Sequence, residues 1–210
     1  MKRNTIIFGI IAFILTSCNI SGGNKKLTQR TQLPTSKELH IDKLFIVGNF
    51  NGDNTLDTIK ESYINSLTGK EIVKPDITDF ALEKIVKTNA LSRLYSNISG
   101  VDTFIVTRIS QQRGLYYLKN LGDINGDKKD EFGYIIDWAD ESNLNSIHVM
   151  TLNNGRIVEL FCFKIHEQLS FDPENLIDQK FIVKPISKKE IEYKFYSDSA
   201  TFEIGKHKFE

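Results

Sequence analysis

The sequence lacks most of the residues and motifs from which catalytic and disulfide-bonded proteins are recognised. Its 210 residues include two cysteines, four prolines and one tryptophan, and so few cysteines exclude a disulfide framework. The four histidines are scattered along the chain. There is no His-Glu-x-x-His motif, no pair of cysteines with zinc spacing, no phosphate loop and no nucleophile elbow. The sequence therefore favours a non-enzymatic protein.

An excess of charge of either sign is also missing. The 27 Lys and Arg residues balance 27 Asp and Glu residues, and cleavage after residue 17 would remove only Lys2 and Arg3, leaving 25 bases against 27 acids. This balance argues against nucleic acid as a partner, because such proteins carry a basic face. The 14 Phe and 7 Tyr residues argue against disorder, because they supply the apolar surface that a core requires.

The amino terminus has the three zones of a secretory signal peptide. Lys2 and Arg3 precede an apolar run over residues 6–15, and Leu15-Thr16-Ser17-Cys18 follows. The apolar run is too short for a membrane-spanning helix, which needs about 20 residues. Leu15-Thr16-Ser17-Cys18 resembles the lipobox of bacterial lipoproteins. That resemblance implies cleavage before Cys18 and acylation of Cys18, and two or more acyl chains make a stable membrane anchor.

Three segments follow from this interpretation. Residues 1–17 form the signal peptide, residues 18–38 are the lipidated cysteine and a polar, flexible tether, and residues 39–210 form a single mainly β domain. Asn19 follows the modified cysteine. In enteric bacteria Asp at this position retains a lipoprotein in the inner membrane, so Asn19 favours the outer membrane over the inner. We therefore expect a location in the cell envelope.

Most of the mature chain alternates β-type segments with Gly, Asn and Asp turns. Asn153-Asn154-Gly155 signals a hairpin. Residues 78–89 are the best helix, with Thr78 as its cap. Strands are expected within 40–47, 58–65, 71–74, 103–109, 115–118, 132–138, 146–152, 156–165, 181–183, 191–196 and 201–204. The sequence therefore predicts a mainly β protein of antiparallel sheets with one inserted helix.

Two segments carry oxygen-bearing side chains in the same pattern. We call residues 49–57 the first loop and residues 123–131 the second loop. Positions 1, 3, 5 and 9 carry Asn, Asp or Glu, position 4 is glycine, and position 7 offers a backbone carbonyl. Ca²⁺ takes 6–8 such oxygens, about 2.3–2.6 Å away. The candidate ligands are Asn49, Asn51, Asp53, Thr55 and Asp57 in the first loop, and Asp123, Asn125, Asp127, Lys129 and Glu131 in the second.

The second loop offers three carboxylates and the first only two, so we expect the second to bind Ca²⁺ more tightly. Metal-free turns are the alternative interpretation, because Asn, Asp and Gly are ordinary turn residues. If Ca²⁺ binds, a structural role is favoured over a catalytic one.

The two loops resemble the calcium loops of FG-GAP and VCBS repeats, whose usual form is Gly-Asp-Phe-Asn-Gly-Asp-Gly-Lys-x-Asp. The resemblance implies that each loop joins neighbouring strands of a β-propeller blade and holds Ca²⁺ structurally. The departures are Asn49 at position 1, and Asn54 and Lys128 at position 6, where the family has glycine. Two repeats cannot build a full propeller, so the fold would be a degenerate pair of blades or a compact β domain. The chain also resembles small lipoproteins of Bacteroidetes-type bacteria that have no assigned function.

Two further features have competing interpretations. Asp137-Trp138-Ala139-Asp140-Glu141 is expected to be a solvated turn around a half-buried Trp, and the alternative is a carbohydrate site. Cys162, within Leu160-Phe161-Cys162-Phe163, is expected to be a small buried hydrophobe, and the alternative is a nucleophile.

The sequence as a whole predicts a membrane-anchored, Ca²⁺-binding lipoprotein that binds a protein or a glycan outside the cytoplasm and is not an enzyme. A glycan hydrolase at the cell surface or in the periplasm is one alternative. An immunity or inhibitor lipoprotein that neutralises a toxin is another.

Overall fold

The structure is a computed structural model that describes residues 43–75, 82–109, 111–139, 144–166, 183–198 and 200–209. The expected signal peptide, Cys18, the tether and the domain boundary at residue 39 lie outside these residues, as do Asp140 and Glu141. Within the described ranges, no helix is long and apolar enough to cross a membrane.

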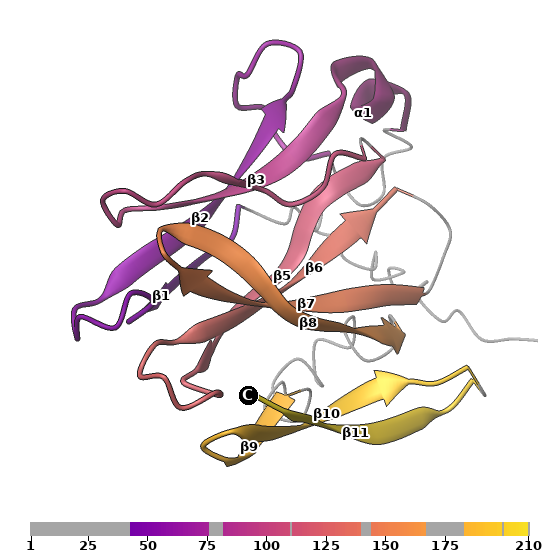
Figure 1. The fold of residues 1–210 in the computed structure, drawn as a ribbon. Coiled ribbons are helices and arrows are strands. Elements are labelled where there is room, and N and C mark those ends of the chain that lie inside the picture. The colour runs from indigo at the N-terminus through magenta and orange to yellow at the C-terminus, as the bar shows by residue number, and fades with distance from the viewer. Residues whose placement is uncertain are drawn as a thin grey trace, which may run out of the picture. The chain divides into compact units, whose positions relative to one another are not determined.

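Three antiparallel sheets make up the described part of the chain, which confirms the predicted mainly β class (Figure 1). In each sheet the strands are neighbours in the order in which the chain runs through them. The first sheet contains β1 (Phe45–Gly48), β2 (Asp57–Asn65), β3 (Ala90–Ser96) and β4 (Phe104–Ile105). The second contains β5 (Gln112–Gly122), β6 (Glu131–Trp138), β7 (Leu144–Asn153) and β8 (Arg156–His166). The third contains β9 (Val183–Ser187), β10 (Glu190–Tyr196) and β11 (Phe202–Lys208).

The predicted helix is present as α1 (Leu82–Thr88), between β2 and β3, and residues 76–81 lie outside the described part. Asn89 has a φ of 45° and its N–H donates to the Val86 carbonyl oxygen, so it ends the helix in the left-handed conformation that Asn tolerates. The chain then enters β3, a strand that the sequence did not predict.

Two predicted strands are shorter than expected. Residues 71–74 contribute only an isolated bridge from Glu71 to Ile64, and residues 103–109 contain only the two-residue strand β4. The predicted hairpin at Asn153-Asn154-Gly155 is confirmed: Asn153 pairs with Arg156, and Asn154 and Gly155 have φ values of 49° and 75°. Two successive positive φ values are the signature of the type I′ turn that joins β7 and β8.

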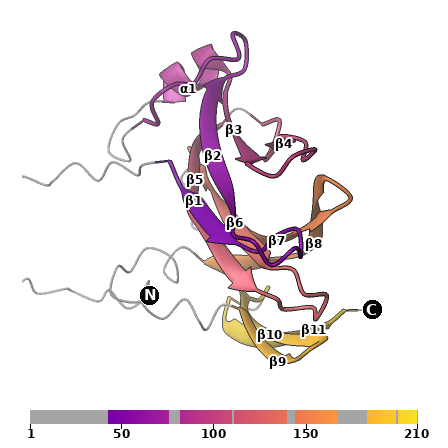
Figure 2. The ribbon, with the colours of Figure 1, turned by 90° about the vertical axis from the view of Figure 1, so that its left-hand side faces the viewer.

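The second sheet lies between the other two (Figures 1 and 2). One of its faces shares a core with Ile46, Ile59 and Leu94 of the first sheet. The other face shares a core with Val183 and Ile191 of the third sheet. This arrangement follows from strand alternation, since successive side chains of β6 enter opposite cores. The second sheet therefore contributes to a core on each face, one shared with the first sheet and one with the third.

Candidate metal centre

Both acidic loops occupy the same place in a four-stranded antiparallel meander. The first loop connects β1 to β2, and the second connects β5 to β6. Each loop is closed by a register pair between the preceding glycine and the acid at position 9, namely Gly48 with Asp57 and Gly122 with Glu131. The duplication seen in the sequence is therefore also a duplication in structure.

Side chains hold the two backbones in the same way. The side chain at position 3 accepts a hydrogen bond from the N–H at position 5: Asn51 Oδ1 from Asp53 at 3.0 Å, and Asn125 Oδ1 from Asp127 at 2.9 Å. The side chain at position 5 accepts from the N–H at position 7, at 2.7 Å in the first loop and 2.9 Å in the second. The side chain at position 1 accepts from the N–H at position 6, at 3.1 Å in both. Each side-chain oxygen at positions 1, 3 and 5 that accepts one of these hydrogen bonds has a second lone pair that can bind a cation.

Positions 4 and 6 have a left-handed backbone in both loops. Gly52 and Gly126 have φ values of 80° and 82°, and Asn54 and Lys128 have values of 65° and 71°. Glycine adopts this conformation without strain and Asn tolerates it, whereas Lys adopts it at a cost of roughly 1–2 kcal/mol. At position 6, Asn54 and Lys128 therefore stand where the repeat pattern has glycine, and both still have a left-handed backbone.

Asp57, at position 9 of the first loop, is buried and incompletely paired. The residue is 5% exposed, and its Oδ2 is the one buried side-chain oxygen or nitrogen without a hydrogen-bond partner in the described part of the chain. Burial raises the pKa of the Asp57 carboxyl, and the charge of Asp53 adds to this, whereas the N–H groups of Asn51 and Phe50 lower it. The contact with these two N–H groups places the carboxylate inside the loop. An unpartnered buried carboxylate oxygen fits a hard cation such as Ca²⁺.

Glu131, at position 9 of the second loop, is fully buried and fully hydrogen-bonded. Its Oε2 accepts from the N–H of Ile124 at 3.0 Å, and its Oε1 accepts from Asn125 Nδ2 and Thr151 Oγ1, each at 3.0 Å. Burial raises the pKa of the Glu131 carboxyl to about 7, because it outweighs the donors, and the charges of Asp127 and Asp123 raise it further. The second loop therefore satisfies its terminal acid with protein donors.

An ammonium group also partly neutralises the second loop. Lys129 Nζ lies 3.5 Å from Asp127 Oδ2 and donates to the Leu152 carbonyl oxygen at 3.4 Å. The first loop has Thr55 at the same position, where its hydroxyl donates to Asp53 Oδ1. Hydrogen bonds from Thr55 and Asn51 lower the pKa of Asp53, so this carboxylate is ionised at neutral pH.

The two loops contact each other through a residue that the sequence analysis did not select. Asp130 Oδ2, at position 8 of the second loop, accepts from the N–H of Asn49 at 3.0 Å and from Asn120 Nδ2 at 2.9 Å. Asn120 also donates to the carbonyl of Val47 at 2.9 Å. A Cβ on Gly48 would lie 2.3 Å from Asn120 Nδ2, so glycine is required there. The sequence pattern could not predict these contacts, because Asn49 and Asp130 are 81 residues apart and Val47 and Asn120 are 73 residues apart.

The acids of the second loop do not converge tightly. In the described ranges, the three residues that bring ligand atoms within 4.8 Å of one another are His148, Glu159 and Cys162, and not Asp123, Asp127 and Glu131. The structure thus places all ten predicted ligands in two equivalent loops. It brings Asp57 to the inside of the first, and it occupies Glu131 of the second with other partners.

Two other predictions fall on described residues. Trp138 is half-buried, as expected, and packs against the core shared by the first and second sheets. The predicted solvated turn is wrong for Asp137 and Trp138, because both end strand β6 and Asp137 is buried, where it pairs with Arg113 at 3.0 Å. The prediction that Cys162 is buried is wrong, because its side chain is exposed. Its neighbours in sequence, Phe161 and Phe163, take the face that packs toward the third sheet, so Cys162 points to the opposite face.

Comparisons with protein-family models, curated proteins and solved structures find no match to this chain.

Proposed function

We propose that this chain is a Ca²⁺-stabilised β protein, anchored in the cell envelope by lipid on Cys18, that binds a protein or a glycan outside the cytoplasm and does not catalyse a reaction. The lipobox-like Leu15-Thr16-Ser17-Cys18 sequence supports the anchor and the location, with the outer membrane favoured by Asn19. The duplicated loops support Ca²⁺ as a structural ion.

The observation that carries the calcium proposal is Asp57. A buried carboxylate oxygen without a partner costs about 1–3 kcal/mol of stability. That cost is removed if a cation binds there, and Asn49, Asn51, Asp53 and Thr55 of the same loop carry further oxygens. The first loop is therefore the stronger candidate, although it has fewer carboxylates than the second.

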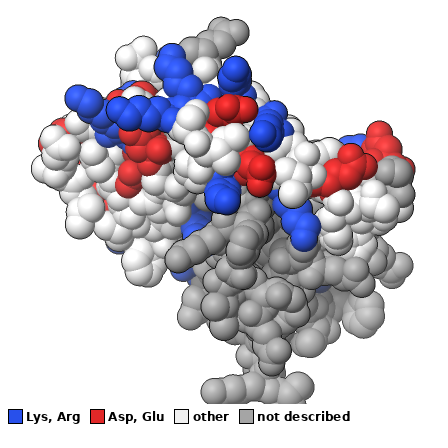
Figure 3. Space-filling model, turned by 90° about the horizontal axis from the view of Figure 1, so that it is seen from below, with Lys and Arg blue, Asp and Glu red and all other residues white. Residues whose placement is uncertain are grey.

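The outer face of the first sheet supports partner binding. Phe45 and Val47 of β1 are 66% and 44% exposed, and Tyr95 of β3 is 39% exposed. These side chains line a shallow pocket together with Lys43, Lys60 and Glu71. Exposed aromatic rings beside charged groups are typical of surfaces that stack on sugars or bind proteins. On another face, acidic and basic side chains are intermixed over the described residues, which supports a partner other than a polyanion (Figure 3).

The test is thermal unfolding of the full-length chain in Ca²⁺ and in chelator. Binding to the native state alone stabilises it by RT ln(1 + [L]/Kd), about 2.7 kcal/mol at a hundredfold excess over Kd. Ca²⁺ should therefore raise the Tm of the unsubstituted chain, and Asp57→Asn should abolish most of that rise. In chelator Asp57→Asn should be as stable as the parent or more so, because it removes an uncompensated buried charge.

Asp102→Asn is the matched control, because Asp102 is exposed and its ion pair with Arg156 is long, at 3.9 Å. It should keep the full response to Ca²⁺. An equal Tm in Ca²⁺ and chelator for the unsubstituted chain would disprove the calcium proposal, and the loops would then be metal-free turns.

A further inference from the structure

A β-bulge gathers three metal-ligating side chains on one face of the hairpin formed by β7 and β8. His148 pairs with Cys162, and Val149 pairs with Phe161, but the next pair is Met150 with Glu159. Leu160 is therefore an extra residue in β8. Without it, Glu159 and Cys162 would point to opposite faces of the sheet. The bulge places both side chains beside His148.

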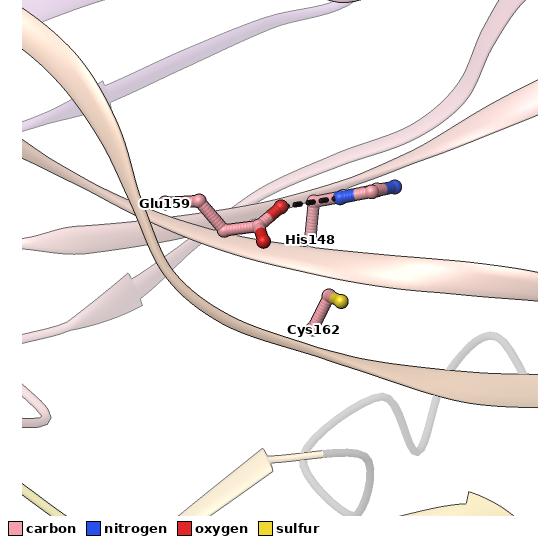
Figure 4. A group of neighbouring side chains, drawn as sticks. All are labelled: His148, Glu159 and Cys162. Atoms are coloured by element: carbon pink, nitrogen blue, oxygen red, sulfur yellow. Dashed lines mark hydrogen bonds and ion pairs between the residues drawn. The ribbon is translucent and has the colours of Figure 1, made fainter.

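The three side chains are close enough to share one ion. His148 Nδ1 lies 2.6 Å from Glu159 Oε2, and the ligand atoms of His148, Glu159 and Cys162 all lie within 4.8 Å of one another. Figure 4 shows His148 and Glu159 pointing toward each other, with Cys162 beside them. The imidazole ring of His148 stacks on Tyr134, with ring centroids 4.8 Å apart and an interplanar angle of 13°. This stacking fixes the plane of the imidazole.

The surroundings of Cys162 argue against a catalytic thiolate. Partial desolvation of the exposed Cys162 and the nearby Glu159 carboxylate raise the pKa of its thiol. An activated cysteine has a lowered pKa and lies beside a cation. Here the Glu159 carboxylate lies near the thiol and disfavours the thiolate. The thiol of Cys162 therefore lacks the lowered pKa that marks an activated cysteine.

The donor set selects the kind of metal. One imidazole nitrogen, one thiolate sulfur and one carboxylate oxygen are ligands of Zn²⁺, at about 2.0–2.1, 2.3 and 2.0–2.2 Å. Ca²⁺ prefers oxygens alone, so this cluster differs chemically from the two acidic loops. His148 and Glu159 have 25% and 43% of their side-chain surface exposed, which leaves room for water as a fourth ligand. Glu159 and Cys162 are exposed, so they can adjust around an ion while His148 keeps its place against Tyr134.

We propose that His148, Glu159 and Cys162 form a site for Zn²⁺ or a similar transition-metal ion, independent of the calcium loops. Binding releases the proton of the thiol, because the ligand is the thiolate, and it replaces the hydrogen bond between His148 and Glu159 with two bonds to the metal. The ion would cross-link β7 and β8 at the bulge. Its fourth ligand would be a water molecule that exchanges with solvent.

The test uses Co²⁺ as a coloured substitute for Zn²⁺. The full-length chain with Cys18→Ala has Cys162 as its only thiol. Titration with Co²⁺ should produce a thiolate-to-cobalt charge-transfer band that saturates at one equivalent and disappears when Zn²⁺ is added. Cys162→Ser in this background should abolish the band, and His148→Gln or Glu159→Gln should weaken binding at least tenfold.

Two controls separate this site from other causes. His207→Gln replaces another partly exposed histidine, and Asp57→Asn changes the first calcium loop; neither should alter the cobalt titration. Absence of the band in the parent would overturn the proposal, as would a band that survives Cys162→Ser. Equal weakening by His207→Gln and His148→Gln would also overturn it, because it would indicate adventitious binding to surface histidines.

Discussion

The first and second acidic loops have the same backbone, but their terminal acids have different surroundings. Glu131 has three protein donors, and Lys129 adds an ammonium group nearby. Asp57 has a buried oxygen with no donor, and its loop has no lysine. The comparison shows that the turn residues set the conformation of the loop, whereas neighbouring segments decide whether its charge is compensated. The number of carboxylates alone therefore does not describe the electrostatic environment of either loop.

The largest difference between the loops should come from their glycines at position 4. Gly126→Ala adds a Cβ that would lie 2.6 Å from the backbone oxygen of Lys188, whereas the Cβ of Gly52→Ala would lie 3.1 Å from the flexible side chain of Lys129. Both variants are destabilised because alanine is strained at a left-handed φ. Only Gly126→Ala also meets backbone, so it should cost about 3 kcal/mol and Gly52→Ala about 1–2 kcal/mol. Urea unfolding measures both, and equal costs would contradict the close packing of the second loop against the third sheet.

A second difference concerns pH. The Glu131 carboxyl ionises near its ordinary pKa of 4.5 when the chain is unfolded, but burial raises its pKa to about 7 in the folded chain. Between these values the folded state binds more protons, so its stability falls as pH rises from about 4.5 to 7 and is flat above. When a chelator is present, the loss of stability should be on the order of 3 kcal/mol.

The corresponding measurement is urea unfolding in chelator at several pH values across that interval. Glu131→Gln should remove most of the slope, and the exposed change Asp198→Asn should leave it intact, because the pKa of Asp198 is lowered by Lys164 and its effect falls at more acid pH. A slope that persists in Glu131→Gln would show that another group is responsible.

The smallest difference should come from position 6. Lys128 and Asn54 both have a positive φ, but only Lys is strained by it. Lys128→Gly should stabilise the chain by about 0.5–1 kcal/mol, since relief of strain exceeds the entropy gained by the unfolded state. Asn54→Gly should change stability little. A thermal melt of the two variants side by side checks this, and an equal or larger gain from Asn54→Gly would argue that the two positions are not equivalent.

The sequence predicted the loops at the level of single residues because their determinants are local. The bonds that shape them join residues two to five positions apart, such as Asn51 to Asp53 and Asp123 to Lys128. The compensation of the Glu131 charge was not predictable in the same way, since Thr151 approaches it from β7, 20 residues further along the chain. The fold class followed from strand and turn signals, but β3 did not, because it starts directly after a helix.

The cluster around Cys162 shows a different limit of sequence reasoning. Leu160-Phe161-Cys162-Phe163 forms an apolar run that indicates burial. No residue type in this run indicates that Leu160 forms a β-bulge. A shift of one residue in register reverses the face on which every following side chain lies. The position of Glu159 beside Cys162 therefore depends on strand pairing, which the sequence pattern alone does not specify.

The contacts between successive loops make the energetics of this chain resemble those of a short repeat protein. Gly52 of the first loop lies against Lys129 of the second, and Gly126 of the second lies against Lys188 at the turn of the third sheet. Each sheet thus depends on its nearest neighbour, as in a linear array whose stability is a sum of unit and interface terms. The middle sheet has two such interfaces and each outer sheet has one. Amide hydrogens of β6 should therefore exchange last, and opening should begin at the ends of the array and move inward.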